Sequence, residues 1–245
     1  MTTGRGVLAV WNDLVWNDVA PGHETEFDTW YLRQHVPERL AVEGFRQARR
    51  YAAPGGAPGY AAFYWLDSVT VLDSPAYRER LAHPTAWTRR MMPRFRNMGR
   101  TPCSIVIDRG AGMGGSATWI AGMRSGAAAT LAPSAALVAA FDDCLRDPAC
   151  VRIQLWQCDA DAARHGNPEA RYRTSVDAVA DWIVFIEAAC ADALAEHREG
   201  LADVLRAQTS ALLMCAPVQR LLWCMQAAEA PPPCADPQWN EAPGA

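Results

Sequence analysis

Lysine is absent from the chain: all 23 basic residues among the 245 are arginine. Chemistry that passes through a lysine Schiff base, as in pyridoxal-phosphate enzymes and imine-forming aldolases, is therefore excluded. The phosphate-binding lysine of a Walker loop is missing as well. These exclusions hold whatever the origin of the arginine bias.

Long apolar runs and paired metal ligands are also missing. No stretch reaches the roughly 18 consecutive apolar residues that a membrane span needs, and the start of the chain lacks a basic segment leading into an apolar one. We therefore expect a cytoplasmic protein without membrane contact. The eight cysteines form no C-x-x-C pair and the five histidines form no H-x-H or H-x-x-x-H pattern, so we predict no metal site.

Two features suggest nucleotide or nucleic-acid binding but are better explained otherwise. Gly110, Gly112 and Gly115 spell G-x-G-x-x-G, yet the following "SATWIAGM" has the pattern of a strand, whereas a dinucleotide site needs a helix there. Five arginines lie between residues 89 and 100, but the chain carries a net charge of −4. We interpret that stretch as a solvated helix face or an attraction for anionic substrates, and we expect no nucleic-acid partner.

The first half has the element order β-α-β-β-α-β. Apolar and β-branched runs predict strands, a stripe of apolar residues at spacings of three and four predicts the first helix, and Gly-rich stretches predict turns. The expected elements are strand 7–16, helix 24–40, strands 45–51 and 60–66, helical segments 74–82 and 85–96, and strand 103–108.

The same order returns after a glycine-rich linker, as in a degenerate tandem repeat. Its expected elements are strand 117–123, helix 134–146, strands 151–158 and 181–188, helices between 190 and 208, and strand 218–225. We therefore divide the chain into a first repeat that carries the site (1–108), a linker (109–116), a second repeat (117–228) and a proline-rich tail (229–245) that we expect to be disordered.

Each repeat predicts a four-stranded antiparallel sheet with two helices on one face, which leaves an apolar face uncovered. Two such sheets in one chain can cover each other. The predicted fold is α+β: two tandem ferredoxin-like β-α-β-β-α-β units that pack sheet to sheet as an intrachain α/β barrel.

Two segments of the first half carry a family resemblance. One is "WYLRQHVPERLAVEGFRQARRY" (30–51), with H-x-P at the end of the first helix and G-F-x-x-x-R-R-Y entering the second strand; the other is "SPAYRERLAHPTAWT" (74–88). Over residues 7–108 the chain resembles the ferredoxin-like dimeric α/β-barrel superfamily, specifically its EthD-like branch. The helix "SAALVAAFDDCLRD" of the second half has neither His nor Pro, so we expect that half to be a structural partner that replaces a second subunit.

The resemblance implies a class of ligand but does not choose a reaction. The superfamily includes cofactor-free monooxygenases, lactone isomerases, polyketide cyclases and haem-binding enzymes, commonly with a cavity between helices and sheet. It therefore implies a small, often aromatic or cyclic, substrate.

His35 is the first candidate for chemistry. Pro37 cannot donate to the carbonyl of Arg33, at a cost of roughly 3 kcal/mol in a regular helix, so we expect the helix to kink or end there. Phe27, Tyr31 and His35 share one face, which their apolar neighbours indicate is the sheet-facing one. An imidazole with an unperturbed pKa of about 6.5 suits proton transfer there. Alternatively, His35 only bonds a carbonyl freed at the kink.

The second strand offers an anion clamp. Alternation sends Arg49 and Tyr51 to one face and Arg50 to the other, so one arginine is expected to enter the cavity. Its planar fork would hold a carboxylate or enolate oxygen, and the tyrosine hydroxyl would stabilise charge that develops on oxygen. The alternative is a salt bridge to Glu38 or Glu43.

The remaining candidates lie around a second helix break and at the end of the first strand. His83 precedes a proline and Trp87 follows one turn later; Trp87 either walls an aromatic pocket or belongs to the core. Asn12 and Asp13 are weaker candidates for substrate contact. Haem is a competing cofactor, because some superfamily members ligate iron with a histidine on the second helix, but the family's serine-aromatic-histidine spacing is not kept around His83.

Together these observations predict a cofactor-independent enzyme that acts on a small cyclic or aromatic anion by proton transfer next to a carbonyl, as in an isomerase or cyclase. The predicted catalytic residues are His35, His83 and Tyr51, and the predicted substrate-binding residues are Arg49, Arg50, Trp87, Asn12 and Asp13. One alternative is a cofactor-free monooxygenase, since a bound carbanion can itself reduce dioxygen. Another is a non-catalytic small-molecule-binding protein. A homodimer of the fused chain is left open.

Overall fold

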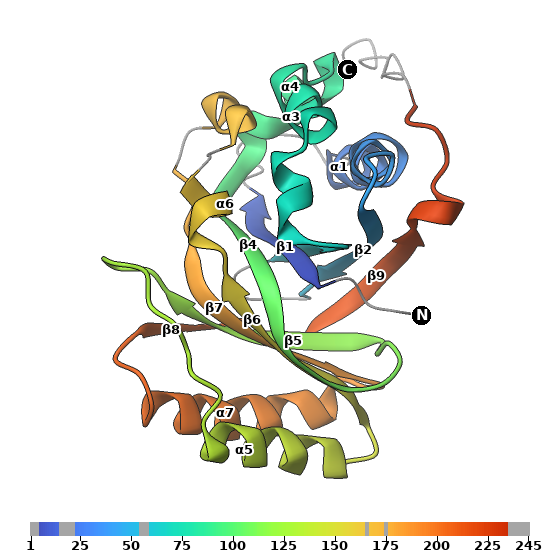
Figure 1. The fold of residues 1–245 in the computed structure, drawn as a ribbon. Helices are drawn as coiled ribbons and strands as arrows, with labels where there is room; N and C mark the ends of the chain where they lie inside the picture. The colour runs from blue at the N-terminus through green and yellow to red at the C-terminus, as the bar shows by residue number, and fades with distance from the viewer. Residues whose placement is uncertain (1–4, 15–22, 54–58, 165–166, 174–175, 235–245) are drawn as a thin grey trace.

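The computed structural model describes residues 5–14, 23–53, 59–164, 167–173 and 176–234, and its strands form one sheet that closes on itself (Figure 1). The strands are β1 (Gly6–Leu14), β2 (Phe45–Ala52), β3 (Tyr60–Leu66), β4 (Phe95–Gly110), β5 (Ser116–Met123), β6 (Cys150–Cys158), β7 (Ala180–Ala188), β8 (Leu212–Cys215) and β9 (Gln219–Gln226).

The closed sheet consists of two four-stranded halves. Strands β4-β1-β3-β2 form the first half and β9-β5-β7-β6 form the second, and the halves join through the pairs β4–β6 and β2–β9. Each half therefore has the same strand order, and all of the pairs between named strands are antiparallel. This arrangement confirms the predicted α+β barrel of two ferredoxin-like units. The short strand β8 extends the sheet beside β5.

Helices cover the outer faces of both halves (Figure 1). The first half carries α1 (His23–Trp30), the π-helix η1 (Tyr31–His35), α2 (Val36–Leu40), η2 (Val69–Asp73), α3 (Pro75–Ala82), α4 (Ala86–Met91) and η3 (Met92–Arg94). The second half carries α5 (Ala135–Arg146), α6 (Ala160–Arg164), η4 (Pro168–Tyr172) and α7 (Asp192–Arg206), followed by η5 (Ala227–Glu229).

Three apolar layers hold the fold together. One lies between the first-half helices and their sheet, and one lies between α5, α7 and the second-half sheet. The third fills the barrel interior with large aromatic side chains, namely Trp11, Trp65, Trp119, Trp156, Phe63 and Phe185. Gly99 makes room for this layer, because a Cβ there would lie 1.9 Å from Cε2 of Trp11. The interior is thus a packed core in this fold.

Several boundaries differ from the sequence-based expectation. Strand β4 begins at Phe95, whereas the arginine-rich pattern predicts helix to residue 96. The loop predicted between the second repeat's middle strands contains α6 and η4. Strand β8 was not predicted, and the expected turn at 54–58 lies outside the described residues. The last strand and the helix starts agree with the pattern to within a few residues.

The end of the described chain packs against the first half. Residues 229–234, for which composition predicts disorder, follow η5 along the first helix, and the amide of Cys234 donates to the carbonyl of Arg33 (2.9 Å). In a regular helix the amide of residue 37 would donate to this carbonyl, but Pro37 has no amide hydrogen. Residues 235–245 lie outside the described part of the chain.

Within the described residues, no helix is both long and apolar enough to cross a bilayer.

Candidate functional site

A recess of about 400 Å³, counted out to the solvent, lies between the first-half helices and the outer face of their sheet. Its floor comes from β1, β3 and β4 and its walls from η1, α2, α3 and η3. The polar residues that line it are Tyr31, His35, Arg39, Tyr64, Tyr77, Arg100, Asn167 and Glu169.

The helix before the recess is widened rather than broken. Residues Tyr31–His35 form a π-helix in which the amide of Val36 donates to the carbonyl of Tyr31, five residues back. The regular helix α2 follows, with Pro37 as its second residue. Pro37 has no amide hydrogen to donate to the carbonyl of Arg33, and the amide of Cys234 donates to that carbonyl instead. π-Helical turns of this kind occur frequently at functional sites.

His35 lines the recess and is 8% exposed. Its ring packs on Trp30 with 4.5 Å between the ring centroids and meets Tyr31 edge-on at 5.2 Å. Burial lowers the pKa of His35 well below 6.5, and the charges of Arg39, Arg50 and Arg173 lower it further. The imidazole is therefore neutral at neutral pH and able to accept a proton. Within the described residues no hydrogen bond joins His35 to the carbonyl of Arg33, which accepts from the amide of Cys234.

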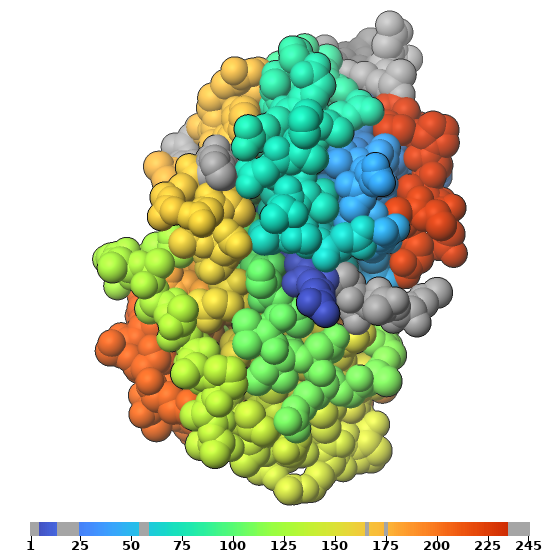
Figure 2. All heavy atoms as spheres, in the orientation of Figure 1, coloured from blue at the N-terminus to red at the C-terminus, as the bar shows by residue number. Residues whose placement is uncertain are grey.

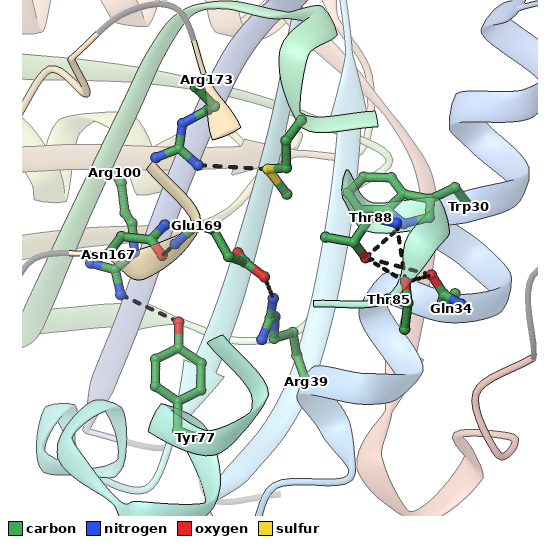
Figure 3. A network of polar contacts seen from close by, with 11 residues as sticks. Trp30, Gln34, Arg39, Tyr77, Thr85, Thr88, Arg100, Asn167, Glu169 and Arg173 are labelled. Atoms are coloured by element: carbon green, nitrogen blue, oxygen red, sulfur yellow. Dashed lines mark hydrogen bonds and ion pairs between the residues drawn. The ribbon is translucent and has the colours of Figure 1, made fainter. Parts of the chain in front are cut away.

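Arginines give the recess a positive potential. Arg39 Nη2 donates to Oε1 of Glu169 (2.5 Å), a pair in which both side chains are buried. Arg100 Nη2 donates to the hydroxyl of Tyr77 (3.3 Å), and Figure 3 shows the two pairs side by side. Arg173 pairs with Asp177 behind them. Only some of this positive charge is neutralised inside the recess, which favours an anionic ligand.

Three buried polar atoms of the recess residues have no hydrogen-bond partner within the described part of the chain: Nδ1 of His35, the hydroxyl of Tyr64 and Nη1 of Arg39. Buried polar groups in native proteins are nearly always paired, and an unpaired one calls for an explanation such as a ligand. The three belong to η1, β3 and α2 and all line one recess. Burial also raises the pKa of Tyr64 well above 10 and that of Tyr31 to about 12, so both phenols remain donors.

The second half contributes to this site. The connection between β6 and β7 crosses to the first half, where Arg100 and Ala178 are joined by a backbone hydrogen bond (3.0 Å). It delivers Asn167 and Glu169 to the recess. Figure 2 shows this segment (yellow) against the α3 and α4 helices, where Arg171 donates to the carbonyl of Ala82 (3.4 Å). The second half is therefore more than a cover for the first sheet.

A second polar network holds the π-helix in place beside the recess (Figure 3). The Thr85 hydroxyl donates to Oε1 of Gln34 (2.6 Å), and Nε1 of Trp30 donates to the Thr88 hydroxyl (3.3 Å). Nε2 of Gln34 donates to the carbonyl of Cys234 (3.0 Å). Since Trp30 also packs on His35, this network orients the imidazole.

The structure places the second-strand candidates away from His35. Arg49 and Tyr51 point into the barrel, where both donate to Oε1 of Glu187, at 2.6 Å and 3.1 Å. Arg50 lies on the helix side, within 2.7 Å of Oδ1 of Asp28. The predicted separation of the two arginines by strand alternation is observed, but the face holding Arg49 and Tyr51 is filled core, and Arg50 does not line the recess.

Arg50 is instead enclosed by aromatic rings. Its guanidinium lies 4.3 Å from the ring centroid of Tyr31 and 4.6 Å from that of Phe27. From this position the guanidinium helps to lower the pKa of His35.

The other predicted residues also lie outside the recess. His83 is on the surface, with Nδ1 3.0 Å from Oε1 of Glu79. Trp87 is fully buried in the core between helices and sheet. Asp13 accepts hydrogen bonds from the amide of Gly59 (2.7 Å) and from Asn97 (2.9 Å), and so ties together the ends of three strands. Its buried neighbour Asn12 donates to the carbonyl of Asp13 (3.3 Å).

Sequence reasoning missed Arg39, Tyr64, Arg100 and Glu169. Arg39 lies one helical turn after His35, so its position on the same face was readable from the four-residue spacing. Tyr64 and Arg100 lie on strands whose helix-facing side could not be told from their barrel-facing side. Glu169 lies 130 residues from its partner in a loop, and no local pattern marks it.

Comparison with solved structures identifies the architecture. No family model matches the sequence, and no curated protein matches it. One similar structure, described as an anthrone oxidase-like protein, covers 95% of this chain and 95% of its own at 10% identity, with a TM-score of 0.56. The fold is that of the dimeric α/β-barrel proteins. Two other structures share this α/β-barrel fold. One is a proposed monooxygenase from Fusobacterium nucleatum, with 10% identity and a TM-score of 0.51, which covers 91% of this chain and 95% of its own. The other is a proposed chlorite dismutase, with 10% identity and a TM-score of 0.51, which covers 91% of this chain and 96% of its own.

Haem is the competing cofactor that the sequence resemblance implies, and the residues of the recess decide whether it fits. An axial histidine must face an open slot wide enough for a macrocycle. His83 lies outside the recess, and His35 faces a recess that also contains the buried Arg39–Glu169 pair, which a macrocycle would have to displace. The residues present do not fit haem.

We therefore expect purified protein to show no Soret band and to give no saturable Soret shift when hemin is added. Absorbance titration checks this directly, with a non-binding protein of similar size as the control for free hemin. A 1:1 shifted band that His35→Ala abolishes would contradict the expectation.

Proposed function

We propose that this α/β-barrel protein is a cofactor-independent oxygenase that oxidises a small aromatic or cyclic anion bound in the recess. The proposal is supported most directly by His35, Tyr64 and Arg39, which line a single recess beside partly neutralised arginine charge and each carry a buried polar atom with no hydrogen-bond partner within the described residues. The names of two structurally similar proteins, a proposed monooxygenase and an anthrone oxidase-like protein, point to the same class of reaction. The resemblance to the EthD-like branch rests on the sequence segments alone.

The first step is removal of a proton from carbon next to an aromatic ring or carbonyl. Neutral His35 accepts this proton, as its lowered pKa keeps it unprotonated before substrate binds. A bound anion then raises the proton affinity of the imidazole, because it offsets the charges of Arg39, Arg50 and Arg173. The base thus becomes stronger when the substrate is in place.

The second requirement is stabilisation of the oxygen on which charge develops. The Tyr64 hydroxyl and Nη1 of Arg39 have no hydrogen-bond partner within the described residues, and Arg100 adds a positive charge from the floor of the recess. Donors of this kind act strongly in a buried site, where water does not compete with them. They favour an enolate or phenolate over its neutral acid.

The third step is oxidation by dioxygen. A carbanion flanked by aromatic rings reduces dioxygen directly, and the overall change R₂CH₂ + O₂ → R₂C=O + H₂O balances without an external reductant. One oxygen atom enters the carbonyl and the other leaves as water. The protein has to supply only the proton acceptor and the oxyanion donors.

Anthrone is a suitable test substrate because its central CH₂ lies between two rings and opposite a carbonyl. With the protein, we expect consumption of one dioxygen per anthraquinone formed, measured with an oxygen electrode and by absorbance. Arg100→Met should raise KM about 10- to 100-fold, in line with the loss of a charged hydrogen bond of about 1.5–3 kcal/mol. Arg96→Met, on the same strand but outside the recess, is the matched control.

Anaerobic incubation separates the proposal from its rivals. If the protein only transfers protons, as an isomerase or cyclase would, it will exchange substrate hydrogen for deuterium without using oxygen. If the protein only binds the compound, the compound will raise the melting temperature of the protein without hydrogen exchange or turnover. Absence of binding, exchange and oxygen uptake with a series of anionic aromatic ketones would count against the recess as an active site.

A further inference from the structure

The second half of the barrel brings together three metal-ligating side chains that the proposed oxidation does not use. Asp147, Cys150 and His197 each present one ligand atom, and these atoms all lie within 4.8 Å of one another. A tetrahedral ion with bonds of about 2.0–2.3 Å holds its ligand atoms about 3.3–3.8 Å apart, so these side chains would close by up to about 1.5 Å to share one ion.

Three separate elements carry these ligands. Asp147 directly follows α5, Cys150 is the first residue of β6, and His197 lies in α7. Helices α5 and α7 lie side by side across the second-half sheet (Figure 1). A shared ion would tie the two helices to each other and to the strand beneath them. No H-x-x-x-H or C-x-x-C spacing announces the site, because the fold and not the sequence brings the ligands together.

The ligands are already oriented. Oδ1 of Asp147 accepts from the amide of Ala149 (2.8 Å), which leaves Oδ2 directed at Nε2 of His197, 3.0 Å away. The Cys150 amide donates to the carbonyl of Asp147 (3.0 Å), so the turn from 147 to 150 is closed. Outer contacts of this type fix ligand geometry in metal sites.

The three ligand side chains differ in their exposure to solvent. Cys150 is buried, whereas the side chains of His197 and Asp147 are 22% and 31% exposed. An ion can therefore enter from solvent and reach the Cys150 sulfur at the bottom of the site.

We propose that Asp147, Cys150 and His197 form a binding site for a divalent zinc-like ion, with one coordination position open to solvent. One thiolate, one imidazole and one carboxylate suit the borderline-soft zinc ion and are poorly suited to magnesium or calcium, which prefer sets made up of oxygen ligands. Binding of the ion displaces the thiol proton of Cys150.

The test uses full-length protein stripped with a chelator and then titrated with Zn²⁺ or Co²⁺. We expect one equivalent to bind, the melting temperature to rise on binding, and Co²⁺ to produce the charge-transfer absorption of a cobalt–thiolate bond. Cys150→Ser should abolish that absorption. His197→Ala, a change on a helix surface, should lower the affinity at least about tenfold.

Two control variants guard against unspecific binding and misfolding. His83→Ala removes an exposed histidine that also faces an acid, and Cys224→Ser removes a thiol on another strand; both should bind the ion as the unmodified protein does. The circular dichroism of each stripped variant checks folding. The proposal is overturned if binding does not saturate at one equivalent, if the cobalt spectrum lacks the thiolate band, or if His83→Ala weakens binding as much as His197→Ala.

Discussion

An Arg49→Ala variant is expected to lose about 3–5 kcal/mol of its free energy of unfolding, because the change leaves the Glu187 carboxylate alone in the barrel. The two side chains are 4% and 0% exposed, and the guanidinium lies 4.2 Å from the centroid of the Trp65 ring. Burial raises the pKa of Glu187, and Arg49 and the Tyr51 hydroxyl oppose that rise. Without Arg49 the charge keeps the hydrogen bond from Tyr51 and the weaker attraction of Arg152.

Arg46→Ala is the matched control on the same strand. Arg46 pairs with Asp67 at a similar distance (2.5 Å), but the two side chains are 58% and 47% exposed. An exposed pair contributes about 0–1 kcal/mol, so this variant should be nearly as stable as the unmodified protein. Urea unfolding of both variants measures the difference. Equal losses would show that the barrel interior does not hold Glu187 as a charged group.

A double variant, Arg49→Met with Glu187→Met, refines the expectation. Replacing both members of a buried pair by apolar residues often restores or raises stability. We therefore expect the double variant to be more stable than Arg49→Ala alone. A double variant less stable than the single one would instead indicate that packing around Arg49, rather than the isolated charge, causes the loss.

His35→Ala is expected to lower kcat/KM of the proposed oxidation by about 10²- to 10⁴-fold, the usual contribution of a general base. The measurement is the steady-state rate of oxygen uptake with anthrone, accompanied by a thermal melt. His83→Ala gives the comparison between a recess histidine and a surface histidine, and we expect it to change the rate less than twofold. Similar losses in the two variants would remove the basis for assigning proton transfer to the recess.

The pH dependence of stability follows from the same residue. The pKa of His35 is lowered on folding, so the unfolded chain binds a proton below about pH 6.5 that the folded chain does not. Its contribution to stability is therefore intact above that pH and falls as the pH drops below it. The acid limb of kcat/KM that arises from His35 should correspondingly lie below pH 6.5. In His35→Gln the melting temperature should be less sensitive to acid over this range.

Local patterns in the sequence were sufficient to predict the repeated order of elements and the barrel. Strand periodicity, the helix stripe ending in H-x-P and the glycine-rich turns act over a few residues, and packing of two apolar sheet faces follows from burial alone. The same patterns placed His35 on the sheet-facing side of its helix and separated Arg49 and Tyr51 from Arg50 by alternation.

Only the tertiary structure decided which face of the sheet carries the polar recess. Arginines lie on both faces of β2, so its pattern does not tell the two faces apart; aromatic rings fill the barrel interior, and Arg49 and Tyr51 are buried there. The recess lies on the helix side of the sheet. Tyr64 and Arg100 line it from neighbouring strands, and Glu169 lines it from the connection between two strands of the other repeat. Side-chain volume and chain crossover determine such a site, and both depend on contacts between residues far apart in sequence.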